Sequence, residues 1–172
     1  GGPTATLNTG DESSPAWPEN AKLVASKLTE TGLFLGWTPA TDNVAVTAYR
    51  VQQDDKELTT TAGDTTWLEV KGLAPWQTYT FTVSAEDGVG NATVQTLTTT
   101  AKTPDNTLPE WPADAALIAS DLTPNAVTLS WPSPSDNVGV EAVKLYRDNV
   151  LLTTLGATEV QFTDTGLSPW ST

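Results

Sequence analysis

The chain has 172 residues, a formal net charge of −13, and neither cysteine nor histidine. The two missing residue types exclude disulfide frameworks, thiol nucleophiles, histidine acid–base chemistry and the usual zinc sites. A strongly anionic chain repels phosphate backbones and anionic lipid surfaces, so we expect no nucleic-acid partner. No stretch approaches the roughly 18 apolar residues that a membrane span needs, so we expect no membrane insertion. The same charge suits either simple solubility or attraction of divalent cations.

Taken in chain order, residues 1–14 are expected to be the tail of a preceding repeat and its linker, and 15–104 one complete domain. Within that domain apolar side chains recur at every second position, as in "YTFTVSA", which starts at Tyr79. Turn residues separate these runs at intervals of about ten residues. Seven short antiparallel strands predict an all-β, two-sheet sandwich. The expected strands are 21–28, 32–38, 45–53, 56–60, 65–71, 78–86 and 91–101.

The rest of the chain repeats this pattern at a constant offset of 94 residues. Trp17 recurs as Trp111, and Trp37 recurs as Trp131. Residues 105–172 therefore predict a linker and an incomplete second sandwich whose last two strands are absent, which would leave the face around Trp131 uncovered. Three explanations stay open: a longer repeat protein, a fragment, or strands supplied by a neighbouring chain, with residues 4–9 donated in return.

The motifs of the complete copy are Pro15, Leu23, Leu35-x-Trp37, Asp42-Asn43-Val44-x-Val46, Tyr49-x-Val51, Gly72-Leu73-x-Pro75 with Tyr79, and Ala85-x-Asp87-x-x-Gly90-Asn91. These motifs resemble the fibronectin type III domain, of the kind common in bacterial secreted proteins. The resemblance implies that Trp37 and Trp131 are buried indoles on the second strand, and that Tyr79 forms a tyrosine corner. Two departures are that Val143 replaces Tyr49 in the second copy and that Trp76 occupies a turn that is usually small or polar.

Four tryptophans lie near the expected domain ends. Trp76 and Trp170 fall in the turn before the sixth strand, whereas Trp17 and Trp111 stand beside prolines at the start of each copy. Three interpretations stay open for them: interdomain packing that stiffens an array, a platform on which sugar rings stack, or ordinary packed turns.

Acidic and amide side chains gather in the loops at one end of the expected sandwich. Asp42-Asn43 and its twin Asp136-Asn137 follow the second strand of each copy, and Asp87 ends the sixth. In this fold these loops lie near the incoming linker. Carboxylate and amide oxygens that converge there could bind Ca²⁺. Alternatively, these side chains only bond their own backbone, as Asp and Asn commonly do in turns.

The predicted function is a non-catalytic extracellular or cell-surface spacer array from a bacterial protein. Its acidic residues lie in turns, and no insertion between strands is long enough to form a cleft, so we expect no enzyme activity. The expected partners are neighbouring repeats of the same chain, and self-assembly by strand donation stays possible. The alternative is an adhesin or carbohydrate-binding module that contacts polysaccharide through its turn tryptophans. No cofactor other than the hypothetical calcium is expected.

Overall fold

The computed structural model describes residues 10–168. All secondary-structure elements assigned in this range are β-strands. None of the described residues forms a helix that is long and apolar enough to cross a membrane. The chain divides into two compact units, Gly1–Asp105 and Asn106–Thr172, and each is considered by itself below.

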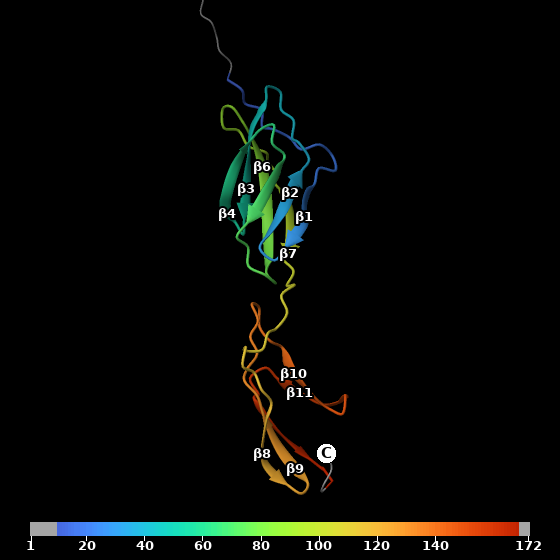
Figure 1. Cartoon of the computed structure of the whole chain (residues 1–172). Coiled ribbons are helices and arrows are strands. Elements are labelled where there is room, and N and C mark those ends of the chain that lie inside the picture. The colour runs from blue at the N-terminus through green and yellow to red at the C-terminus, as the bar shows by residue number, and fades with distance from the viewer. Residues whose placement is uncertain (1–9, 169–172) are drawn as a thin grey trace, which may run out of the picture. The chain divides into compact units, whose positions relative to one another are not determined.

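The first unit is a sandwich of two antiparallel sheets (Figure 1). This arrangement confirms the predicted all-β fold. One sheet has the order β1-β2-β5 and the other the order β4-β3-β6-β7. Their strands are β1 (Leu23–Thr29), β2 (Gly32–Trp37), β3 (Val46–Gln53), β4 (Lys56–Ala62), β5 (Trp67–Lys71), β6 (Thr78–Asp87) and β7 (Leu97–Lys102).

The core of the first unit comes from alternate residues of the strands that face one another. In β6, Phe81, Val83 and Ala85 have no exposed surface, while Thr82 and Ser84 between them are half-buried. Full burial of one such large apolar side chain contributes about 1.5–3 kcal/mol to folding. The thirteen buried residues of this core are Leu23, Leu33, Leu35, Trp37, Ala40, Tyr49, Val51, Val70, Leu73, Phe81, Val83, Ala85 and Ala101.

The seventh strand begins later than the sequence pattern predicts, at Leu97 instead of residue 91. Thr93 explains the difference, because its hydroxyl accepts a hydrogen bond from the Ala85 amide where a backbone carbonyl would otherwise do so. The Thr93 amide in turn donates to the Ala85 carbonyl. Residues 91–96 therefore follow the end of β6 without forming a regular ladder.

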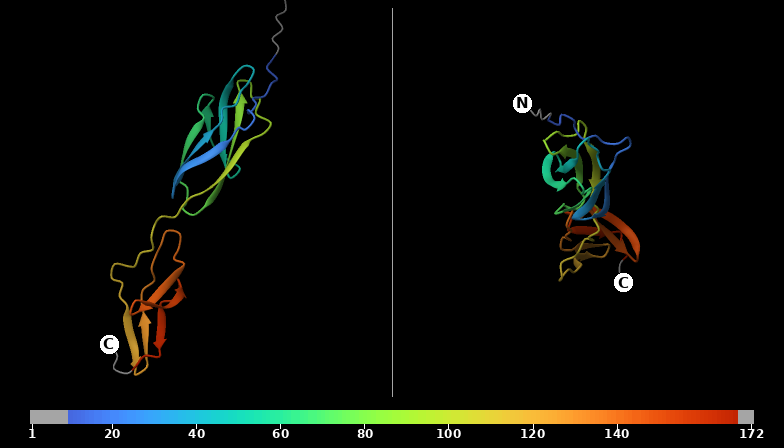
Figure 2. Two further views of the ribbon diagram at one scale, coloured as in Figure 1. Left: turned by 90° about the vertical axis from the view of Figure 1, so that its right-hand side faces the viewer. Right: turned by 90° about the horizontal axis from the view of Figure 1, so that it is seen from above.

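The second unit reproduces the first five strands of the first unit, each close to 94 positions later. It has a sheet of order β12-β9-β8 and a separate β10-β11 pair, which can be followed from two other directions in Figure 2. The strands are β8 (Ile118–Thr123), β9 (Ala126–Ser130), β10 (Ala142–Arg147), β11 (Val150–Gly156) and β12 (Gln161–Thr165).

The core of the second unit is small. Its buried apolar residues are Trp131, Val143 and Leu145. Trp131 and its twin Trp37 are similarly buried, and neither indole N–H has a hydrogen-bond partner within residues 10–168. The two copies thus repeat a side-chain environment as well as a sequence.

The expectation that the face around Trp131 is uncovered is only partly met. The Trp131 side chain is 8% exposed, so the indole itself is covered. Beside it lies an open apolar depression of about 420 Å³, lined in part by Trp111, Leu117 and Val143. Trp111 and Leu117 are more than half exposed. The uncovered apolar surface therefore lies next to the indole.

Candidate functional site

Three carboxylates meet at one end of the first unit. Asp11, Asp42 and Asp87 each contribute an oxygen atom, and these atoms all lie within 4.8 Å of one another. We call this group the acidic pole. The three residues are far apart in the sequence, and the fold brings together the segment before β1, the loop after β2 and the end of β6.

Asp87, the last residue of β6, is fixed by the turn that follows the strand. Its Oδ1 atom accepts hydrogen bonds from the amides of Val89, Gly90 and Asn91 at 2.8–2.9 Å, and the side chain is 5% exposed. Burial by itself raises the pKa of Asp87, but these bonds and one from the Asn91 side chain outweigh burial and hold the pKa below its ordinary value. The Asp87 side chain is therefore an anion at neutral pH.

Asp42 is held by the loop that follows β2. Its Oδ2 atom accepts hydrogen bonds from the amides of Val44 and Ala45, an arrangement typical of aspartate in a turn. Its other oxygen, Oδ1, is buried and has no hydrogen-bond partner in the described part of the chain. A buried oxygen of an ionised carboxylate without a partner is costly, because desolvation is not compensated.

Asp11 enters the group from the segment before β1. Its Oδ1 atom accepts hydrogen bonds from the Ser13 amide and from the Asn43 side chain. Asn91 holds this segment against the turn after β6, because its Nδ2 atom donates to the Asp11 carbonyl and to Asp87 Oδ2. Asn43, one of the predicted calcium residues, directs its amide nitrogen toward the Asp11 carboxylate.

The charges of the acidic pole are not balanced by cationic side chains. The ion pairs found among residues 10–168 join Arg50 to Glu57 and Glu86, Lys71 to Glu69, and Arg147 to Asp164. None of them includes a carboxylate of the acidic pole. Like charges at this separation repel one another unless a cation lies between them.

The twin loop in the second unit repeats part of this arrangement. Asp136 Oδ1 accepts hydrogen bonds from the amides of Val138 and Gly139, and its Oδ2 is buried without a partner in the described range. Asn137 is exposed. Among the described residues, however, Asp136 belongs to no group of three converging acidic side chains.

The tryptophans near the domain ends have different surroundings. Trp17 packs on its own unit, since its ring stacks on Tyr49 at 6.0 Å and its Nε1 donates to the Gln95 carbonyl. Trp76 is 53% exposed, and the Lys102 ammonium lies 3.3 Å from its ring centroid. Trp170 lies outside the described residues. Packing of Trp76 or Trp111 between units stays a prediction.

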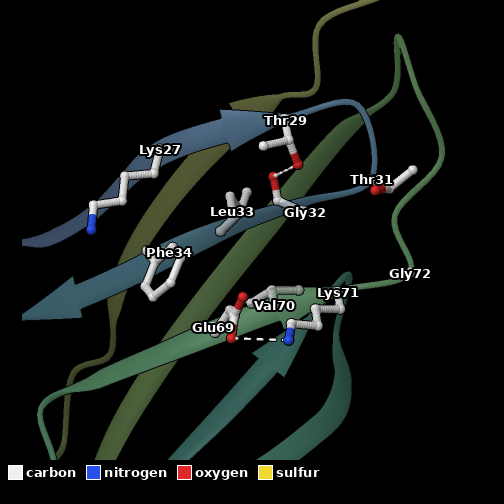
Figure 3. Close-up of a pocket in the computed structure, with 10 residues that line it drawn as sticks. All are labelled: Lys27, Thr29, Thr31, Gly32, Leu33, Phe34, Glu69, Val70, Lys71 and Gly72. Atoms are coloured by element: carbon white, nitrogen blue, oxygen red, sulfur yellow. Dashed lines mark hydrogen bonds and ion pairs between the residues drawn. The ribbon is translucent and has the colours of Figure 1, made fainter.

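An aromatic pair that the sequence reasoning missed lies on the outer face of the β1-β2-β5 sheet. Phe34 and Trp67 stack with ring centroids 6.4 Å apart, and Trp67 is 59% exposed. Lys27 lies over the Phe34 ring, beside a shallow depression of about 270 Å³ (Figure 3). The available signal was the alternation of Phe34 with Leu33 and Leu35, which points its ring away from the core.

The tyrosine predicted to form a corner lies in the expected arrangement. The Tyr79 hydroxyl accepts a hydrogen bond from the Ala74 amide at 2.8 Å, which ties β6 to the chain upstream of it. This contact is the one that the resemblance implies for Tyr79.

Comparison with known proteins supports the same assignment. The family model described as "Fibronectin type III domain" matches residues 16–101. Chitinase A1 of Niallia circulans is 35% identical over 153 residues, which are 86% of this chain and 21% of that protein. Exoglucanase B of Cellulomonas fimi is 33% identical over 167 residues, 93% of this chain and 14% of that protein. The chain thus spans only 21% and 14% of the length of these relatives.

Among solved structures, Chitinase ChiA74 from Bacillus thuringiensis aligns with a TM-score of 0.49 and 21% identity, over 95% of this chain and 28% of that one. The family match, the sandwich and the tyrosine contact agree with one another. The chain belongs to the fibronectin type III family.

Proposed function

We propose that this chain is a non-catalytic accessory segment of a secreted bacterial enzyme that degrades polysaccharide. The observation that carries the proposal is the similarity to a chitinase and an exoglucanase over most of this chain but only 21% and 14% of their lengths. A segment of that size corresponds to an accessory module that accompanies the catalytic part of such an enzyme. The proposed location is outside the cell.

The architecture of the first unit suits a spacer. Its interior is filled by thirteen buried side chains, and its strands are joined by short turns, as between Thr29 and Gly32 or between Gln53 and Lys56. A closely packed sandwich resists deformation, so it can keep the parts on either side of it apart.

A segment exchange tests this proposal. The part of Chitinase A1 that matches this chain is deleted in one variant and replaced by this chain in another, and hydrolysis of insoluble chitin and of a soluble oligosaccharide is measured. We expect deletion to lower the rate on insoluble chitin and replacement to restore it, with equal rates on the soluble substrate. A replacement no better than the deletion would contradict a spacer role. Hydrolysis by this chain alone would contradict a non-catalytic one.

A second candidate function is direct contact with polysaccharide through the Phe34–Trp67 pair. Exposed aromatic rings on the face of a sheet can stack against sugar rings, and Trp67 offers the more exposed ring of the two. Trp76 is a weaker candidate, because Lys102 already lies over one face of its ring.

Affinity electrophoresis in gels containing soluble chitin or cellulose derivatives tests this candidate. We expect the wild-type chain and Trp76→Ala to be retarded and Trp67→Ala to migrate freely. The two variants each remove one exposed tryptophan, so Trp76→Ala is a matched control. Equal migration of all three proteins in gels with and without polysaccharide would eliminate the contact.

A further inference from the structure

We propose that the outer face of the β1-β2-β5 sheet prefers a polysaccharide whose sugar rings carry an acetamido group, as in a β-1,4-linked chain of N-acetylglucosamine. This inference rests on the contact with polysaccharide given above as the second candidate function, and it names the sugar that the Phe34–Trp67 pair would take. A sugar ring would stack on Trp67, and its acetamido group would lie against the carboxylate of Glu69 and the ammonium of Lys71.

Three side chains of β5 form a strip along this face. Trp67, Glu69 and Lys71 occupy alternate positions of the strand, so all three point away from the core. Their Cα atoms extend over about 13 Å, at about 3.3 Å per residue. In the neighbouring strand β2, Phe34 pairs with Glu69 and Gly36 pairs with Trp67. A Cβ atom added at Gly36 would meet nothing within 4 Å, so the central strand leaves space for a sugar ring beside the indole.

The ion pair on this strip matches the two polar atoms of an amide. Lys71 Nζ lies 3.1 Å from a carboxylate oxygen of Glu69, and both side chains are exposed. A carboxylate only accepts hydrogen bonds and an ammonium only donates them. An acetamido group offers one N–H donor and one carbonyl acceptor, so it can satisfy both charged groups with charge-assisted hydrogen bonds. Since an exposed ion pair contributes little stability by itself, opening it to admit the amide costs little.

A depression of about 270 Å³ gives the apolar end of the acetamido group a place (Figure 3). Its lining combines Glu69 and Lys71 with Phe34 and with Gly32, which contributes no side chain. A methyl group that enters beside the Phe34 ring leaves water, which favours binding. A sugar whose ring carries only hydroxyl groups has no apolar end to place there. The depression therefore favours the acetamido sugar over glucose.

The second unit provides an internal comparison for this face. An inward position keeps its residue after 94 positions, as Trp37 becomes Trp131. The outward positions change: the residues in place of Phe34, Trp67, Glu69 and Lys71 are Thr128, Gln161, Thr163 and Thr165. The hydroxyls of Thr128 and Thr163 form a hydrogen bond with each other at 3.2 Å. The sandwich therefore does not require aromatic rings or an ion pair at these positions, which favours a binding role for them in the first unit.

Two hexasaccharides test the inference on the intact chain. The β-1,4-linked hexamers of N-acetylglucosamine and of glucose differ only at C2 of each ring, and their binding is followed by amide and indole N–H resonances. We expect the resonances of Phe34, Trp67 and Glu69 to move, and the N-acetylglucosamine hexamer to bind about tenfold more tightly, as one added charge-assisted hydrogen bond would give. Equal affinities would overturn the acetamido preference and leave the aromatic contact in place. Unmoved resonances with both hexamers would overturn the contact as well.

Matched variants assign the preference to the ion pair. Glu69→Thr and Lys71→Thr introduce the residues of the second unit, and each should lower the affinity for the N-acetylglucosamine hexamer to that for the glucose hexamer. Glu57→Thr removes an exposed carboxylate that is paired with Arg50 in the other sheet, and it should keep the preference. A preference that survives in Glu69→Thr and Lys71→Thr would overturn the proposal. The methyl resonances of Val51, buried in the first unit, show whether each variant is folded, and the wild-type titration decides if one is not.

Discussion

Two tyrosine hydroxyls in the first unit accept hydrogen bonds from backbone amides, but their surroundings differ. Tyr49 is fully buried and its donor, Ala40, is 8% exposed, whereas the donor to Tyr79, Ala74, is exposed. Tyr49→Phe leaves a buried N–H without a partner, so we expect a loss of about 1–3 kcal/mol in the free energy of unfolding. Tyr79→Phe should cost about 0.5–1.5 kcal/mol, because water can replace the hydroxyl.

Urea unfolding followed by the methyl resonances of Val51 and Val83 measures both variants, since these side chains are buried in the first unit. A larger loss for Tyr79→Phe than for Tyr49→Phe would show that the corner contact, and not desolvation of the amide, sets the energy.

One ion pair in the second unit has no equivalent in the first. Arg147 Nη1 donates to both oxygens of Asp164, whose side chain is 7% exposed, while the matching positions are Gln53 and Val70. Arg147→Gln leaves a nearly buried carboxylate without its cation and should destabilise the second unit by about 1–2 kcal/mol, a cost moderated because Arg147 is half exposed. Adding Asp164→Val should recover most of that loss. A double-mutant cycle measures the coupling, and simple additivity would contradict it.

At the scale of single residues, the sequence predicted the roles of individual side chains better than the contacts between segments that lie far apart in the chain. The burial of Trp37 and the hydroxyl contact of Tyr79 follow from alternation and from the family resemblance. The buried, unpartnered oxygen of Asp42 could not be predicted, because it depends on how two other loops approach it. The Phe34–Trp67 pair was missed because Trp67 has no counterpart in the second copy, where Gln161 stands.

Among the secondary-structure elements, the turn between β4 and β5 lies unusually close to β3. A Cβ atom added at Gly63 would overlap the Val46 carbonyl oxygen, whereas one added at Gly36 in β2 meets nothing within 4 Å. Gly63→Ala must therefore push the turn away from β3, and we expect a cost of about 1–3 kcal/mol. Gly36→Ala is the matched control and should change the free energy of unfolding by less than about 0.5 kcal/mol. Equal midpoints for the two variants in urea would contradict the close approach.

The strands themselves were largely predictable, because alternation of apolar residues reports a half-buried sheet directly. The exception was the start of β7, where the Thr93 side chain takes a place in the hydrogen-bond pattern that backbone would otherwise hold. Periodicity cannot detect such a replacement, since threonine is equally common within strands.

At the scale of the whole molecule, two units of related sequence have unequal cores. The first unit buries thirteen apolar residues in one cluster, and the second buries three. In the first, β3 pairs with both β4 and β6, whereas among the described residues β10 pairs with β11 alone. Fewer buried side chains and an unpaired strand edge both lower the free energy of local opening.

We therefore expect the second unit to open first, and twin positions provide the measurement. Val51 and Leu145 lie 94 residues apart at equivalent places in β3 and β10, and both are buried. In native-state hydrogen exchange of the intact chain, the amide of Leu145 should be protected at least ~100-fold less than that of Val51. The two residues occupy equivalent strands of the same fold, so the difference in amide protection reports the surroundings of each strand. Equal protection would mean that the second unit gains its stability from contacts other than its own buried core.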